Sequence, residues 1–178
     1  MKPVLVLAVL LLVPGWLIAG EAVRELPETA PTVVLHDQFD TPQRLSFPTT
    51  NLTFLTIADR RGSEQIAGWV APIQHRFGSR ISICGIADVS AVPRFMRGFI
   101  KRQFQRAQTH PVMLDWSGDA VRAFAYSPDK VNVLVIDGAG KILKRLAGPA
   151  DETLVKEVGD LMDAALKSSP AQNAPASP

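Results

Sequence analysis

Apolar residues along this chain gather into short runs separated by turn-forming residues, a pattern typical of strands. The runs at 52–58 and 81–86 are continuously apolar-rich, which predicts strands covered on both faces. Asp40-Thr41-Pro42 predicts the turn of an N-terminal hairpin, and the sequence at 137–140 predicts a second, tight hairpin turn. The expected strands are 32–36, 44–47, 52–58, 81–86, 111–114, 131–136 and 141–146.

Other apolar residues recur at helical spacing between these runs. Ser63, Ser90 and Asp151 each precede such a segment and are expected N-caps, with Pro93 in the first turn of the second helix. The expected apolar stripe of the second helix is Val92, Phe95, Met96, Phe99, Ile100 and Phe104. A short helix is also expected to end near residue 126. This order predicts an α/β fold, with a mixed central sheet flanked by helices on both faces.

The chain begins like an exported protein. Residues 1–22 hold a lysine, an unbroken apolar run and small residues suited to cleavage, which indicates a signal peptide. An uncleaved N-terminal anchor is the alternative. We expect a linker at 23–31, one domain at 32–166 and a disordered tail at 167–178. The domain is then periplasmic or secreted, or held at the inner membrane by its N-terminal helix.

The composition of the chain limits the partners and cofactors that we expect for it. A formal net charge of +2 is modest, and we expect no nucleic acid partner. The single cysteine, Cys84, excludes an internal disulfide framework. His36, His75 and His110 stand on three separate segments, so we expect no metal site and no cofactor.

Four segments, taken in order, resemble the redoxin branch of the thioredoxin-like superfamily, which includes peroxiredoxins and exported thiol-disulfide reductases. They are Leu35–Ser46, similar to the N-terminal hairpin of redoxins, Ile86-Ala87-Asp88, Pro111–Asp115, and Val133–Ile142, similar to their late hairpin. The resemblance implies a thioredoxin-like fold with an N-terminal β-hairpin. It also implies a reactive cysteine where the first core strand meets its helix, since a helix N-terminus lowers the pKa of a thiol.

This chain departs from the resemblance at that place. No cysteine lies between Asp59 and Ala67, and Val131 or Asn132 stands where thioredoxin-type reductases carry a proline. Thiol exchange requires an attacking thiolate, which a serine hydroxyl cannot replace. We therefore expect the usual activity of the fold to be lost or altered.

Three features are left as candidates. Cys84 lies between isoleucines in a strand, as expected of a buried small side chain, the alternative being a reactive thiol. The degenerate loop, Asp59, Arg60, Arg61, Gly62, Ser63 and Glu64, is either an exposed turn or an anion- or partner-binding site. The basic helix, which carries Arg94, Arg97, Lys101, Arg102 and Arg106, is either an ordinary surface helix or a contact for a partner or an anionic membrane.

The sequence thus favours an exported redoxin-like protein with a degenerate active site, in a non-catalytic binding or accessory role. Its partner is expected to be another periplasmic or membrane protein. The alternative is a redoxin-type antioxidant or thiol-disulfide oxidoreductase that uses Cys84 with a partner thiol. A membrane-anchored accessory protein is a third reading.

Overall fold

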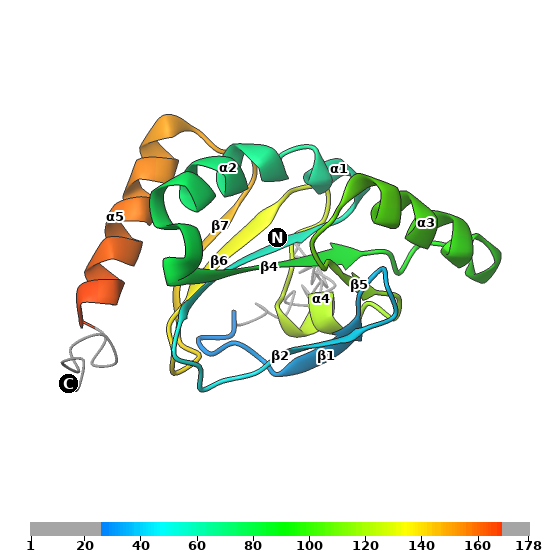
Figure 1. Ribbon diagram of the computed structural model, residues 1–178, viewed down its shortest axis with the longest axis horizontal. Coiled ribbons are helices and arrows are strands. Elements are labelled where there is room, and N and C mark those ends of the chain that lie inside the picture. Colours follow the sequence, from blue (N-terminus) through cyan, green and yellow to red (C-terminus); the bar gives the residue numbers. More distant parts are fainter. Residues whose placement is uncertain (1–25, 169–178) are drawn as a thin grey trace, which may run out of the picture.

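The computed structural model describes residues 26–168, which form a central sheet with helices on both faces (Figure 1). The strand order is β5-β4-β3-β6-β7, with β3, β4 and β5 parallel and with β6 and β7 antiparallel to their neighbours. The strands are β3 (Leu52–Ala58), β4 (Ile81–Asp88), β5 (Met113–Asp115), β6 (Asn132–Ile136) and β7 (Ile142–Ala147). The mixed sheet predicted from the sequence is confirmed.

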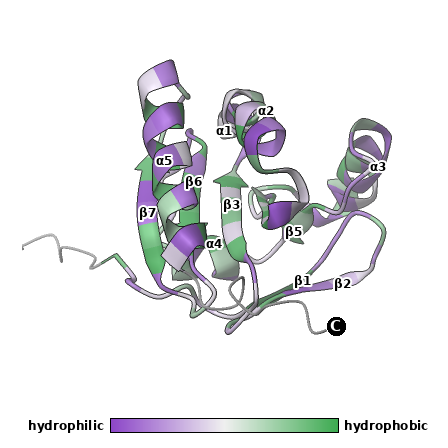
Figure 2. Cartoon of the chain, turned by 60° about the vertical axis from the view of Figure 1, so that its left-hand side comes forward, coloured by the Kyte–Doolittle hydropathy of each residue, from purple (hydrophilic) through white to green (hydrophobic). Residues whose placement is uncertain are grey.

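One face of the sheet is covered by α1 (Arg60–Ser63), α2 (Ile66–Phe77) and α5 (Glu152–Ser168). Trp69 of α2 and Met162 of α5 are fully buried there against β3 and β6. The other face is covered by α4 (Asp119–Ala123) and the N-terminal hairpin, whose apolar side chains form a second core with alternate residues of the same strands. Figure 2 shows the apolar strands enclosed between these two layers.

The predicted N-terminal hairpin forms a small sheet of its own. β1 (Val33–His36) pairs antiparallel with β2 (Pro42–Leu45), so Pro42 begins a strand rather than ending the turn. The buried carboxylate of Asp37 closes the turn by accepting hydrogen bonds from the backbone N–H groups of Phe39 and Thr41. Asp37 also bridges to Met113, which attaches the hairpin beside β5.

Two helix starts differ from those expected. Asp59 caps α1 through its side chain, whereas Ser63 ends α1 and donates its hydroxyl to the carbonyl of Arg60. Ser90 bonds to the carboxylate of Asp88 in a local turn, and its helix begins only after Pro93. A 3-10 turn (η2, Arg94–Met96) then leads into α3 (Arg97–Ala107). In both places an aspartate at the end of a strand, Asp59 just after β3 and Asp88 as the last residue of β4, accepts nearby N–H groups with its short carboxylate.

The expected Asp151 cap is confirmed, since its carboxylate accepts the N–H of Leu154 at 2.9 Å. α5 runs to Ser168, so the first two residues of the expected tail are helical.

Thr29, inside the expected linker, forms an isolated β-bridge with Lys141, and Ala30 donates its N–H to the carbonyl of Gly140, so this part of the linker is bonded to the domain. The expected signal peptide lies outside the described residues. Among residues 26–168, none of the helices combines the length and apolar content that a membrane crossing needs.

The apolar stripe of the second helix is expected to face the core, and this expectation is wrong for Phe95, Met96 and Phe99 but not for Val92, which packs at the sheet edge. Phe95, Met96 and Phe99 are exposed by 87%, 37% and 48%, whereas Ile100 and Phe104 pack against a small cluster at the sheet edge. The cause is the position of α3, which lies beside β5, a strand of only three residues at the end of the sheet. Such a short edge strand offers too little surface to cover the whole stripe.

Candidate functional site

The degenerate loop follows β3 at the end of the sheet where α1 and α2 begin. Asp59, just after the strand, has an extended backbone, and its side-chain Oδ1 accepts the N–H of Gly62 at 2.8 Å. The backbone N–H of Asp59 donates to the hydroxyl of Tyr126 at 3.1 Å. The N-terminus of α1 is therefore already occupied by a carboxylate of the chain itself.

A second loop, residues 127–131 before β6, lies against the degenerate loop and is bonded to it at two points, with a third bond to the adjacent Gln65. The N–H of Asp129 donates to Oδ2 of Asp59 at 2.7 Å. The carboxylate of Asp129 pairs with the Arg61 guanidinium at 3.1 Å, although both side chains are largely exposed. The N–H of Val131 donates to the side-chain oxygen of Gln65 at 3.2 Å. We call this pair of bonded loops the closed loop pair.

Gly62 brings the two backbones into contact. A Cβ atom on residue 62 would lie 2.5 Å from both the carbonyl carbon and the oxygen of Lys130, and 2.8 Å from the nitrogen of Val131. Only glycine fits such an approach without movement of one of the loops. In the resembling reductases the proline beside the reactive thiol precedes the corresponding strand, so the two loops that meet here are the ones that would frame the reacting sulfur.

The charges at the closed loop pair are held by internal bonds. Burial acts to raise the pKa of the Asp59 carboxyl, but hydrogen bonds from the N–H groups of Gly62 and Asp129 outweigh it and lower that pKa. Burial and the adjacent Asp59 carboxylate raise the pKa of Tyr126. At neutral pH this leaves a carboxylate and a neutral phenol, neither of which titrates near the pH where a general acid or base works best.

The remaining residues of the degenerate loop, Arg60, Ser63 and Glu64, are exposed. Their binding role stays a prediction. Sequence reasoning had selected this loop, but it missed Gln65, Tyr126, Asp129 and Lys130 as its contacts. The only available signal was the resemblance, which placed Val131 or Asn132 beside the missing thiol.

Cys84 lies away from the closed loop pair. It pairs with Leu55 in the middle of β3, is half-buried, and packs against the core formed with the hairpin. Burial raises the pKa of its thiol. Cys84 also lines a hollow of about 200 Å³ together with Arg44 and His110. Cys84 lies inside β4 and not at the start of any helix that the structure describes, where a thiolate would be stabilised.

The five cations of the basic helix fall into two groups. Lys101 pairs with Asp40, while Arg97 lies over the Trp116 ring at 5.1 Å from its centroid and donates to the Trp116 carbonyl at 3.2 Å. Arg94, Arg102 and Arg106 are exposed, and none of them forms an ion pair within the part of the chain that the structure describes. The structure thus separates two cations that hold the helix in place from three that face solvent.

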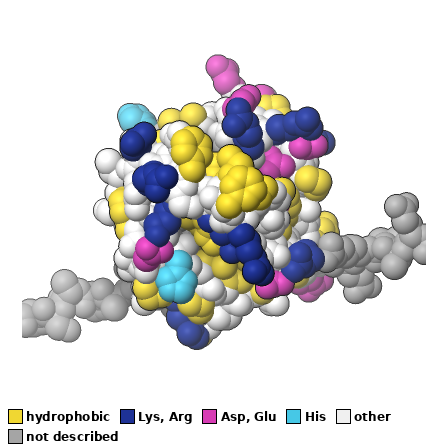
Figure 3. Space-filling view, turned by 90° about the vertical axis from the view of Figure 1, so that its right-hand side faces the viewer, with side chains coloured by type: hydrophobic (Ala, Val, Ile, Leu, Met, Phe, Trp, Pro, Cys, Tyr) yellow, Lys and Arg dark blue, Asp and Glu magenta, His cyan; other side chains and the backbone are white. Residues whose placement is uncertain are grey.

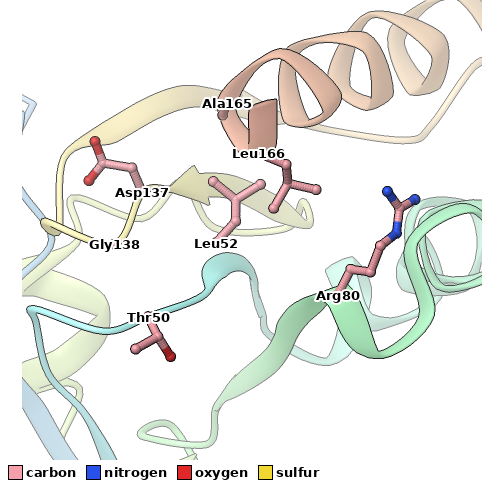
Figure 4. Close-up of a pocket in the computed structure, with 7 residues that line it drawn as sticks. All are labelled: Thr50, Leu52, Arg80, Asp137, Gly138, Ala165 and Leu166. Atoms are coloured by element: carbon pink, nitrogen blue, oxygen red, sulfur yellow. The ribbon is translucent and has the colours of Figure 1, made fainter. Parts of the chain in front are cut away.

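Within residues 26–168, no group of three His, Cys, Asp or Glu residues is arranged to hold a metal ion. A pocket at the opposite end of the sheet measures about 40 Å³, far below the roughly 300–1,000 Å³ typical of small-molecule sites (Figure 4). Its walls are Thr50, Leu52, Arg80, Asp137, Gly138, Ala165 and Leu166.

Solved structures identify the fold, whereas neither a family model nor a curated protein sequence matches this chain. A candidate thiol:disulfide interchange protein DsbE of Chlorobium tepidum superposes with a TM-score of 0.62 at 16% identity, covering 80% of this chain and 99% of that one. The exposed lipoprotein thioredoxin Etrx1 of Streptococcus pneumoniae gives 0.57 at 16% identity, covering 73% and 98%. The peroxidoxin BcpB of Mycobacterium tuberculosis gives 0.54 at 21% identity, covering 79% and 94%.

The chain therefore has a thioredoxin-like fold, as the resemblance implied. Its single cysteine lies in β4, and its sequence places none at the junction of β3 and α1.

Proposed function

We propose that this is an exported thioredoxin-fold protein that acts by binding a partner rather than by thiol chemistry. The observation that carries the proposal is the closed loop pair. Where a redoxin needs an open, electropositive place for a thiolate, this chain has the Asp59 carboxylate, bonded to both loops. The contact of Gly62 with the Lys130 backbone supports the proposal further, because it brings the two loops together at this point.

An exported location is supported by the pattern of residues 1–22. One solved structure with this fold is, by its name, an exposed lipoprotein. No cysteine lies within residues 1–22 or directly after them, so we do not propose a lipid anchor on cysteine. N-terminal sequencing of the protein recovered from cells would give a start near residue 23 for a released periplasmic protein, and Met1 for an anchored one.

The partner-binding surfaces we propose are the exposed side chains of the degenerate loop and the exposed cations of the basic helix. Arg60 and Glu64 face solvent at one end of the sheet, and Arg94, Arg102 and Arg106 face solvent beside β5. Both groups are available to a partner, either a protein or an anionic membrane surface, without any change to the closed loop pair.

Thiol assays on the purified chain test the proposal. We expect neither the parent protein nor Cys84→Ser to reduce insulin disulfides with dithiothreitol, or to consume hydrogen peroxide, above the rate of reductant alone. A thioredoxin serves as the positive control. Turnover by the parent at the rate of the positive control would overturn the proposal, and loss of that turnover in Cys84→Ser would establish the alternative in which Cys84 reacts with a partner thiol.

That alternative has one observation in its favour. Cys84 opens onto the hollow that it shares with Arg44 and His110, so its sulfur is not sealed inside the core. The raised pKa of the thiol weighs against it, because the thiolate is the reactive form.

A further inference from the structure

The first half of the helical region beside β5 exposes apolar side chains that a folded domain normally buries. Phe95 is exposed by 87%, Phe99 by 48% and Met96 by 37%. Aromatic side chains gain most from removal from water, so a cluster of them left exposed on one helix marks an interaction surface. We call Phe95, Met96 and Phe99, with Arg94, Arg102 and Arg106, the α3 face.

The arginines of this face extend the same surface. Phe95, Phe99, Arg102 and Arg106 follow one another at spacings of four, three and four residues, which places them along one side of the helical region. Ile100 and Phe104 occupy the opposite side and pack on the domain. The exposed side is thus aromatic in its first half and cationic in its second.

The charge of this region has one sign. No acidic residue occurs from Ser90 to Pro111. Asp40 is paired with Lys101, which is not part of the α3 face. Arg94, Arg102 and Arg106 have no ion pair with any residue in the range 26–168.

The α3 face lies at an outer side of the molecule. In Figure 1, α3 stands at the end of the sheet remote from α5, and Figure 3 shows that side with exposed apolar side chains among Lys and Arg. An occupant can therefore reach it without displacing another element of the described fold.

We propose that the α3 face binds the surface of an anionic lipid bilayer, with Phe95 and Phe99 entering the boundary of headgroups and acyl chains and with the arginines contacting lipid phosphates. An amphipathic helix that pairs aromatic side chains with unpaired cations fits such a surface. Long arginine side chains reach phosphates while their stems stay in apolar surroundings. This inference deepens the proposed binding function, on which it rests, by naming the partner.

The test places an environment-sensitive fluorophore on Gln103→Cys, one turn after Phe99 and exposed, in a Cys84→Ser background of the full chain. A matched label on Thr153→Cys reports α5 at the far side. Because the first label reports α3 alone, any contribution of residues 1–22 to vesicle binding does not mimic the signal. Vesicles are phosphatidylglycerol with phosphatidylcholine in equal parts, or phosphatidylcholine alone.

We expect the label at 103 to shift to shorter wavelength with anionic vesicles only, and the label at 153 to stay unchanged. Arg102→Ala with Arg106→Ala should raise the lipid concentration for half-maximal shift about 10-fold or more. Phe95→Ser with Phe99→Ser should raise the same lipid concentration by a factor on the order of 10. Added salt should weaken the response of the parent.

Matched controls are Lys156→Ala with Lys167→Ala for charge and Val34→Ser for exposed apolar surface, all outside the α3 face. Near-ultraviolet circular dichroism verifies that each variant is folded. No shift at 103, an equal shift with neutral vesicles, or an equal loss in the controls would overturn the inference and leave a protein as the occupant. The thiol assays read out the proposed function separately, so the two can fail independently.

Discussion

The backbone of Lys130 runs directly over Gly62, so the loop before β6 rests on the first turn after β3. We predict that Gly62→Ala destabilises the protein by roughly 1–3 kcal/mol, because the added methyl group meets rigid backbone atoms 2.5 Å away. The thermal midpoint should fall by about 2–4 °C per kcal/mol.

Gly98→Ala is the matched control for this prediction. Its Cβ would meet only the end of a flexible arginine side chain at 3.6 Å, inside α3. It should stabilise by roughly 0.5–1 kcal/mol, since alanine is the better helix former. Equal midpoints for the two variants would contradict the close contact at Gly62.

Asp59→Asn should destabilise the protein at neutral pH by roughly 1–3 kcal/mol. The two carboxylate oxygens of Asp59 accept the N–H groups of Gly62 and Asp129. In asparagine an NH₂ group replaces one of these oxygens, so one backbone N–H faces another donor. The folded-state pKa of Asp59 is lowered from 3.8, so its contribution is present above that pH and is lost as the pH falls below it. Denaturant titrations should therefore show a smaller difference between the free energies of unfolding of parent and variant at pH 3 than at pH 7.

Asp129→Asn controls for charge at the same place. The backbone N–H of residue 129, not its carboxylate, bonds to Asp59, and the Arg61 pair is largely exposed. The free energy of unfolding of this variant should be less than about 1 kcal/mol below that of the parent. A loss as large as that of Asp59→Asn would show that the exposed ion pair, rather than the Asp59 carboxylate, holds the loops.

Restoring the proline of the resembling reductases should harm this protein. Val131→Pro removes the N–H that donates to Gln65, at a fully buried position, and should cost roughly 1–3 kcal/mol. The measurement is a double-mutant cycle with Gln65→Ala, in which the cost of the proline should shrink by about 0.5–1.5 kcal/mol. Strict additivity would mean that the Gln65 bond does not hold the loop.

The Cys84 thiol should react slowly in the folded protein. Burial raises its pKa above 9.0, so little thiolate is present at pH 8. Labelling with a chromogenic disulfide should be at least about 10-fold slower than for free cysteine and should become fast in denaturant. Rapid native labelling would instead favour the alternative in which Cys84 is reactive.

Local pattern was enough to predict the strands, the order of strands and helices, and the Asp151 cap, because each depends on neighbours within a few residues. It failed at Ser63 and Ser90 for a local reason as well. Asp59 and Asp88 stand just upstream, and each accepts a nearby backbone N–H with its own carboxylate, an outcome that propensity alone does not decide.

The sequence by itself determined the alternation of strands and helices and the lack of a cysteine at the junction of β3 and α1, because periodicity and residue identity are carried by the chain itself. The resemblance of four of its segments to redoxins implied the thioredoxin-like fold. Only the tertiary structure decided that Asp59 binds the loop 70 residues away, since nothing local encodes that contact. It also decided that Phe95 and Phe99 stay in solvent. Their spacing fits a buried stripe, but a three-residue edge strand leaves that side of the helix uncovered.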